Sequence, residues 1–210
     1  ESACACIAVV REGGVQCCHN AAMKIAILDR DGTINALEPD AFVASPDDWT
    51  ALPGALEAIA RLNHAGWHVV VATNQPGLGR GLFDMATLNA IHAKMHKQLA
   101  AVGGRIDAVF FCPHAPDDAC HCRKPEPGLL EQICERYGVD AEDVVVAGNC
   151  RVHLLAGAAL GARLHLLCTG ESAAMEPGQA LPPTWPAGVQ IHADLAAFAE
   201  HLLTNASAAA

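Results

Sequence analysis

Short apolar runs alternate with longer mixed segments along the chain from Met23 onward. The apolar runs predict strands at residues 24–28, 67–72, 108–111, 144–147 and 164–168, and their nearly continuous apolar character is typical of parallel strands buried on both faces. The mixed segments predict helices at 53–65, 85–102, 128–137, 152–160 and 194–203. Alternation of this kind predicts an α/β fold, namely a Rossmann-like, doubly wound parallel sheet with helices on both faces.

The same pattern divides the chain into three parts. Residues 1–22 show no periodicity, and we interpret them as a disordered or non-native extension ahead of Met23. Residues 23–203 carry the alternating elements and are expected to form one domain, which includes a loop rich in Pro and Gly at 170–189. Residues 204–210 are expected to form a frayed tail.

Composition and charge restrict the partners of this domain. The formal net charge of −10 argues against nucleic acid, because phosphate backbones require basic patches. No apolar stretch reaches the roughly 20 residues needed to cross a bilayer, so no membrane association is expected. The ten cysteines occur without a recognisable secretory signal, which favours reduced thiols in the cytoplasm. A single domain without repeats is expected to be a monomer.

The most informative chemistry follows the first predicted strand, in the segment Leu28-Asp29-Arg30-Asp31-Gly32. Because side chains alternate along a strand, Asp29 and Asp31 can point toward one pocket. Two carboxylates at the carboxyl end of a strand suit a nucleophile beside a proton donor, with a hard cation between them. The alternative is a surface turn, since Asp and Gly are common turn residues. The buried apolar residues directly before the pair favour the catalytic interpretation.

Other polar loops also follow predicted strands, where ligands bind in such sheets. After the second strand, Thr73, Asn74, Gln75 and Arg80 supply a hydroxyl, two amides and a guanidinium within a glycine-rich loop. After the third strand, Arg123 and Lys124 are adjacent cations. Small polar donors together with cations suit a phosphate and a polyol. Each loop alone is also compatible with an ordinary solvated surface.

A cluster of cysteines and histidines in the loop after the third strand predicts a metal site. Cys112, His114, Cys120 and Cys122 lie within eleven residues and match a tetrahedral Cys3His zinc site. Four protein ligands leave no position for water, so the site is expected to be structural. His121 is an alternative nitrogen ligand.

Taken together and in this order, these motifs resemble the haloacid dehalogenase superfamily of phosphatases: Asp29-x-Asp31-Gly-Thr, Thr73-Asn74-Gln75, Cys112-Pro-His114 with Cys120-x-Cys122-Arg123-Lys124-Pro125, and Gly148-Asn149. The resemblance spans residues 23–203 and implies the doubly wound fold without a large cap, with the zinc loop as an insert. Within the superfamily the pattern is most similar to the heptose bisphosphate phosphatase family of lipopolysaccharide biosynthesis, since Gly79-Arg80-Gly81 carries the arginine of that family. The histidinol-phosphate phosphatase family, which shares the zinc loop and the first motif, is the alternative.

The resemblance implies phosphoryl transfer through an aspartyl-phosphate. Asp29 would attack phosphorus, and Asp31 would protonate the leaving oxygen and then activate water. Thr73 and Lys124 would hold the phosphoryl oxygens. The resemblance further implies that Asn74, Gln75, Arg80 and Arg123 contact the remainder of a small phosphorylated sugar. A magnesium ion would be bound by Asp29, the carbonyl of Asp31 and an acid of the fourth motif.

The fourth motif departs from the family pattern, because Asn149 and His153 stand where the family has two aspartates. Magnesium prefers anionic oxygen ligands, so Asn149 predicts a weakened magnesium site and a slower enzyme. A softer metal assisted by His153 is a further possibility. A catalytically silent relative that binds a phosphorylated sugar or a protein partner is the alternative from a different class. The intact set of Asp29, Asp31, Thr73 and Lys124 favours an enzyme.

Overall fold

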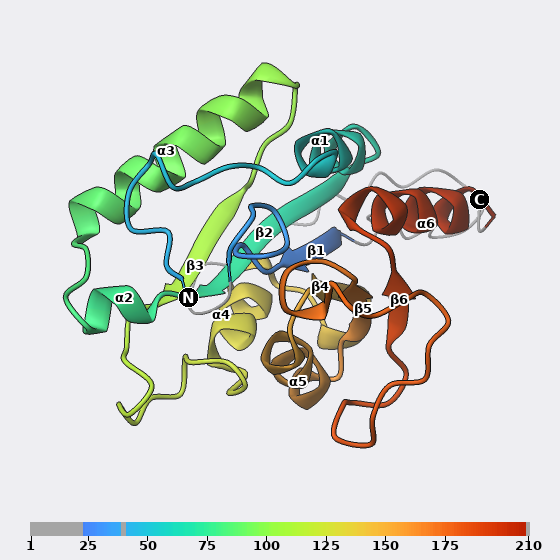
Figure 1. Ribbon diagram of the computed structural model, residues 1–210. Helices are drawn as coiled ribbons and strands as arrows, with labels where there is room; N and C mark the ends of the chain where they lie inside the picture. The colour runs from blue at the N-terminus through green and yellow to red at the C-terminus, as the bar shows by residue number, and fades with distance from the viewer. Residues whose placement is uncertain (1–22, 39–40, 209–210) are drawn as a thin grey trace, which may run out of the picture.

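Six parallel strands form a single sheet in the order β3-β2-β1-β4-β5-β6 in the computed structural model, which describes residues 23–38 and 41–208 (Figure 1). The extension predicted for residues 1–22 lies outside the described residues. The strands are β1 (Lys24–Leu28), β2 (Trp67–Asn74), β3 (Ala108–Cys112), β4 (Val144–Gly148), β5 (Arg163–Leu167) and β6 (Gln190–His192). The strand order reverses direction between β1 and β4, as in a doubly wound sheet.

Helices cover both faces of this sheet. They are α1 (Ala55–His64), α2 (Pro76–Gly79), α3 (Met85–Ala101), α4 (Gly128–Tyr137), α5 (Arg151–Leu160) and α6 (Leu195–Ala208), with short 3₁₀ turns at Ala141–Asp143 and Gly170–Ser172. The apolar sides of α1, α3 and α6 share one core with the sheet, and those of α4 and α5 share a second core on the opposite face. The three-layer α/β/α arrangement predicted from the sequence is thereby confirmed.

Strand β1 shows why its sequence is apolar throughout. Ala26 and Leu28 enter the core under α1 and α6, whereas Ile25 and Ile27 enter the core under α4 and α5, and all four are fully buried. A strand covered on both faces has no solvent side on which polar residues would be tolerated. Polar residues therefore begin only where β1 ends, at Asp29.

Several predicted boundaries differ from the observed ones. Strand β2 continues to Asn74, so Thr73 and Asn74 lie at the end of a strand instead of in a loop. Helix α6 continues past residue 203 to Ala208, so the tail predicted from residue 204 was wrong for most of its length. The alanines in this segment have high helix propensity, which explains the extension. The short elements α2 and β6 were not predicted, because four and three residues are too few to show a period.

The topology places the carboxyl ends of β1, β2 and β4 side by side, so the segments that follow these strands converge at one edge of the sheet. Within residues 23–38 and 41–208 no separate cap domain lies over this edge. None of the described helices combines the length and the apolar character that a membrane crossing requires.

Candidate functional site

A cavity of about 880 Å³ opens at the carboxyl ends of the central strands. Its lining combines residues that follow β1, β2, β3 and β4, which are far apart in the sequence. It includes every residue predicted for catalysis, substrate binding and magnesium: Asp29, Asp31, Thr73, Asn74, Gln75, Arg80, Arg123, Lys124 and Asn149. The expectation that the strand ends bring these side chains together agrees with the structure.

A buried ion pair lies at the floor of the cavity. The Lys124 Nζ atom is 2.8 Å from Asp29 Oδ2, and the two side chains are 2% and 8% exposed. The other carboxylate oxygen of Asp29 accepts a hydrogen bond from the backbone nitrogen of Arg30 at 2.8 Å. Burial alone would raise the pKa of Asp29, but the charge of Lys124 outweighs it and holds this pKa below its ordinary value. Asp29 is therefore ionised at neutral pH, as a nucleophile must be.

Lys124 is fixed by contacts on both its side chain and its backbone. Its ammonium group also donates to the carbonyl of Ala72 at 2.8 Å and to His153 Nδ1 at 3.0 Å. The Asn74 side chain donates to the carbonyl of Lys124 and accepts from its backbone nitrogen, both at 3.1 Å. The amide of Asn74, predicted as a substrate contact, is thus used to position Lys124.

Asp31 is held by a second ion pair. Arg30, which is fully buried, donates from Nε and Nη2 to the two oxygens of Asp31 at 3.0 and 2.9 Å. Gln75 and Asn35 add hydrogen bonds to the same carboxylate at 2.9 and 3.1 Å. Gln75 also donates to the Thr73 hydroxyl at 2.9 Å, and this hydroxyl keeps its hydrogen for a further acceptor. Four donor atoms converge on Asp31 and fix the orientation of its carboxylate.

Arg30 is the functional residue that sequence reasoning missed. Its guanidinium additionally donates to Gln75 Oε1 at 3.1 Å and contacts His92 Nε2 at 3.1 Å. Burial and the nearby Arg30 charge lower the pKa of His92 to about 4, so this imidazole is neutral and accepts from Arg30. In the sequence, the position of Arg30 between two aspartates was the indication that its guanidinium could be held by an ion pair.

Asn149 lies beside Asp31 and is oriented by its hydrogen bonds. With the amide turned so that each contact pairs a donor with an acceptor, its nitrogen donates to Thr33 Oγ1 and to the backbone carbonyl of Asp31, both at 2.9 Å. Its oxygen accepts from the backbone nitrogen of Glu171 at 3.1 Å. The side chain therefore presents a donor to the carbonyl that was predicted as a magnesium ligand.

His153 and Cys150 complete the surroundings of Asp29. His153 is fully buried, and its Nδ1 atom accepts from Lys124 and lies 3.9 Å from Asp29 Oδ2. Burial and the Lys124 charge lower the pKa of His153 to about 3, so the imidazole is neutral. The Cys150 thiol donates to Asp29 Oδ2 at 3.3 Å, and burial raises its pKa, so it stays protonated. His153 thus serves as an acceptor for Lys124, which does not favour a role as a metal ligand.

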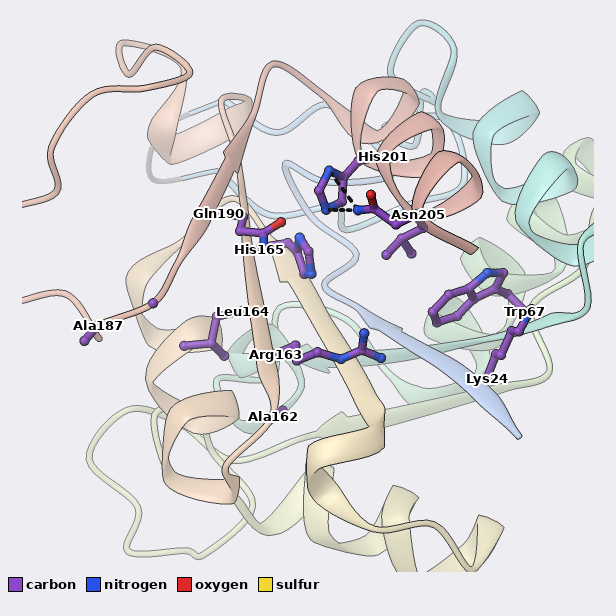
Figure 2. Close-up of a pocket in the computed structure, with 12 residues that line it drawn as sticks. Lys24, Trp67, Ala162, Arg163, Leu164, His165, Ala187, Gln190, His201 and Asn205 are labelled. Carbon is purple, nitrogen blue, oxygen red and sulfur yellow. Dashed lines mark hydrogen bonds between the residues drawn. The ribbon is translucent and has the colours of Figure 1, made fainter. Parts of the chain in front are cut away.

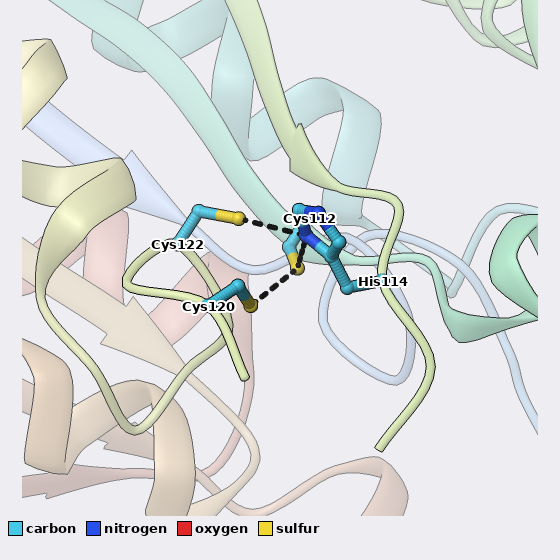
Figure 3. A group of neighbouring side chains, drawn as sticks. All are labelled: Cys112, His114, Cys120 and Cys122. Carbon is cyan, nitrogen blue, oxygen red and sulfur yellow. Dashed lines mark hydrogen bonds between the residues drawn. The ribbon is translucent and has the colours of Figure 1, made fainter. Parts of the chain in front are cut away.

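The cysteine and histidine side chains of the loop after β3 come together as the sequence predicts (Figure 3). The ligand atoms of Cys112, His114, Cys120 and Cys122 all lie within 4.8 Å of one another. Two sulfurs are 3.8 Å apart, and two sulfur–nitrogen distances are 3.4 and 3.2 Å. A tetrahedral zinc site with bonds of about 2.3 Å to sulfur and 2.0 Å to nitrogen requires separations of this size.

His121, the alternative nitrogen ligand, takes a different direction. Its Nε2 atom is 2.7 Å from a carboxylate oxygen of Glu131, and its Nδ1 atom is 4.0 Å from Glu126. The ring is largely exposed and is not one of the four clustered side chains. The geometry therefore favours His114 as the imidazole of the cluster.

Comparisons with known proteins agree with this geometry. The family model described as Polynucleotide kinase 3 phosphatase matches residues 24–161. The chain is 53% identical over 184 residues to a D-glycero-beta-D-manno-heptose-1,7-bisphosphate 7-phosphatase of Bordetella bronchiseptica, covering 88% of this chain and 100% of the relative. It is 44% identical over 180 residues to the protein of the same name from Pseudomonas aeruginosa, covering 86% and 98%.

Solved structures of heptose bisphosphate phosphatases also match the chain. The crystal structure of the D,D-heptose 1,7-bisphosphate phosphatase from B. bronchiseptica, complexed with magnesium and phosphate, matches with a TM-score of 0.80 and 52% identity, covering 87% of this chain and 99% of the other. The corresponding enzyme from Burkholderia thailandensis matches with a TM-score of 0.65 and 51% identity, covering 86% and 99%.

The buried Arg30–Asp31 pair predicts a specific stability difference. Substitution Arg30→Met leaves the Asp31 carboxylate without its cation and is expected to lower the free energy of unfolding by roughly 3 kcal/mol. Arg61→Met is the matched control, because Arg61 pairs with Glu200 in solvent and is expected to contribute less than about 1 kcal/mol. Urea unfolding of both variants measures the difference. Equal losses in the two variants would contradict a structural role for the Arg30 pair.

Proposed function

Since the chain belongs to the D-glycero-beta-D-manno-heptose-1,7-bisphosphate 7-phosphatase family of the haloacid dehalogenase superfamily, we propose that it removes the 7-phosphate of D-glycero-D-manno-heptose 1,7-bisphosphate. The observation that carries this proposal is the ionised Asp29 held against Lys124 at the floor of the large cavity. Histidinol phosphate was the alternative substrate, and the comparisons do not favour it.

The chemistry follows from the position of the two carboxylates. Asp29 attacks phosphorus, the bond to the sugar oxygen breaks, and that oxygen takes a proton from Asp31. In the second half, the ionised Asp31 removes a proton from water, which attacks the aspartyl-phosphate and releases phosphate and Asp29. The four hydrogen bonds to Asp31 hold its carboxyl group in one orientation at the cavity, as both halves of the reaction require.

The remaining residues of the cavity divide into two groups. Thr73 supplies a donor for the phosphoryl oxygens and Lys124 supplies a positive charge beside them, and Arg80 and Arg123 supply charge for the remote phosphate of the substrate. Arg80 lies over the Phe42 ring at 5.7 Å, which orients its guanidinium. Asn74 and Gln75 are better assigned to positioning, since their amides are engaged by protein partners.

Magnesium is implied by the family, and the residues of this chain offer the ion only a weak site as they are arranged. Both oxygens of Asp29 already accept hydrogen bonds, and the carbonyl of Asp31 accepts from the amide of Asn149. Asn149 would have to turn its oxygen inward and would offer only a neutral ligand. We therefore assign Asp29, the backbone carbonyl of Asp31 and Asn149 to a weak magnesium site.

Zinc is proposed for the cluster of Cys112, His114, Cys120 and Cys122. Three thiolates and one imidazole form a closed set that favours zinc and leaves no open position. The cluster fixes the loop that leads into Arg123 and Lys124, since Cys122 directly precedes them. Its proposed role is therefore to hold these two cations at the edge of the cavity.

The proposed activity is tested by phosphate release from heptose 1,7-bisphosphate, with histidinol phosphate as the competing substrate and magnesium present. Turnover of the bisphosphate is expected, with complete loss in Asp29→Asn, which keeps the shape of the nucleophile and removes its charge. Glu38→Gln, at the rim of the same cavity, is the matched control and should retain activity. Turnover of histidinol phosphate alone would reassign the substrate. Release from neither would contradict the proposed activity and indicate a disabled site.

Restoring the two acids of the fourth motif is expected to increase activity. The double variant Asn149→Asp, His153→Asp should raise kcat/KM at least tenfold, because an anionic site stabilises magnesium, and a gain of about 1.4 kcal/mol in transition-state stabilisation corresponds to a factor of ten. The half-saturating magnesium concentration should fall in the same variant. Identical rates and metal dependence in the two proteins would show that the acids are dispensable here.

The zinc proposal predicts a defined metal content. Protein prepared without added metal should retain zinc at the cluster, and the double variant Cys120→Ser, Cys122→Ser should lose about one equivalent by elemental analysis. Cys134→Ser is the control, since Cys134 lies outside the cluster. Unchanged zinc content in the double variant would refute the assignment of these ligands.

A further inference from the structure

Several histidines have no place in the reaction as described so far, and they lie at different ends of the molecule. His165 and His201 line a cavity of about 570 Å³ beside the first residues of β1, β2 and β5, at the opposite end of the sheet from the phosphatase site (Figure 2). His92 comes from α3 and reaches the surroundings of Asp31 through Arg30. Of these three imidazoles, His92 is therefore the one placed to influence the reaction.

The packing of α3 turns His92 toward the core. Leu88 and Met95 are fully buried, and they lie four residues before and three residues after His92. Residues three or four apart share one face of a helix, so His92 lies on the face that packs inward. Its own side chain is half-buried. Because this packing fixes the helix, the imidazole is a fixed point from which a second side chain can be held.

The hydrogen bond between Arg30 and His92 can form in one direction only. A guanidinium carries donors and no acceptor, so Arg30 Nη1 donates and His92 Nε2 accepts across 3.1 Å. The Nε2 atom therefore carries no proton, and the neutral ring holds its proton on Nδ1. A doubly protonated ring would have no acceptor and would place a second cation beside the fully buried side chain of Arg30.

Arg30 transmits this constraint to Asp31. Its Nε and Nη2 atoms donate to the two oxygens of Asp31 at 3.0 and 2.9 Å, and Nη2 also donates to Gln75 Oε1 at 3.1 Å. The Gln75 amide in turn donates to Asp31 at 2.9 Å, so these three side chains hold one another. Within the part of the chain that the structure describes, His92 is the guanidinium's only hydrogen-bond partner outside this group. It ties the group to α3.

We propose that His92 is a positioning residue for proton transfer by Asp31 and that it acts through Arg30. The proposal rests on the proposed phosphatase reaction. Asp31 lines the cavity and His92 does not, so the imidazole has no direct contact with the substrate. Without His92, an N–H group of a buried cation would lack its acceptor, which is unfavourable, and the guanidinium would turn toward another one. The Asp31 carboxylate would turn with it, and a displacement of about 1 Å can slow a reaction roughly a hundredfold.

The tautomer of His92 is the first test, because it does not depend on activity. Nitrogen-15 NMR of the full chain at neutral pH, with the His92 signals assigned by their absence in His92→Gln, should show a neutral ring protonated on Nδ1. A ring protonated on Nε2, or on both nitrogens, could not accept from Arg30 and would overturn the proposal.

Kinetics of three variants form the second test. His92→Leu removes the acceptor and should lower kcat for heptose 1,7-bisphosphate at least about tenfold with KM within about twofold, because the displaced group acts in the transition state and not in binding. His92→Gln keeps an acceptor oxygen near the position of Nε2 and should recover most of this loss. His96→Leu, at an exposed histidine of the same helix, is the matched control and should equal the parent.

A better leaving group separates a proton-transfer effect from general damage to the fold. p-Nitrophenolate leaves without a proton, so the first half of the reaction with p-nitrophenyl phosphate does not require Asp31 as an acid. Single turnover with enzyme in excess measures that half alone, and His92→Leu should match the parent there. Equal losses on the two substrates, or no loss on the bisphosphate, would overturn the proposal. An inactive parent would contradict the proposed function itself, whereas these outcomes in an active parent contradict only the role of His92.

Discussion

The buried ion pair between Asp29 and Lys124 is the constraint on which the rest of the active site depends. Two charges removed from water are stable only if their attraction and their remaining hydrogen bonds offset the lost hydration. The carbonyl of Ala72 and the imidazole of His153 accept the other protons of Lys124, and Arg30 donates to the free oxygen of Asp29. Asn74 fixes the Lys124 backbone from both sides. Each of these contacts therefore stabilises the position of Asp29, the proposed nucleophile.

The charges of the site are balanced before substrate arrives. Asp29 is paired with Lys124, and Asp31 is paired with Arg30. Asn149 and His153 are neutral, so they add no negative charge that a divalent cation would have to offset. A phosphate dianion entering the cavity would meet Asp29 with Arg80 and Arg123 as the additional positive groups. The electrostatic requirement for magnesium is smaller here than with two aspartates, and the stabilisation available to the transition state is smaller as well.

The sequence predicted the secondary-structure elements and the types of residue in the site more accurately than the direction in which each side chain points. Apolar runs located five of the six strands, and the rule that ligands bind beyond strand ends brought Asp29, Thr73 and Lys124 together correctly. The roles of Asn74 and Gln75 were not accessible, because an amide that contacts substrate and one that supports a neighbour look the same in sequence. The pairing of Arg30 with the adjacent Asp31 was missed for the same reason. Strand β6 was missed because its one apolar residue, Ile191, lies between two polar ones.

The surroundings of Asn149 have room for an acidic side chain of the same size, although Asn149 itself carries no charge. Asn149 is enclosed by Gly32 and Gly170, both in the left-handed region, and a Cβ atom at either glycine would collide with its amide. The hydroxyl of Thr33 and the backbone nitrogen of Glu171 can both donate to a carboxylate. An aspartate differs from Asn149 by one atom type and fits the same enclosure. With an aspartate at position 149, the backbone carbonyl of Asp31 would lose the hydrogen bond that it accepts from the Asn149 amide. A cation could bind this carbonyl oxygen instead.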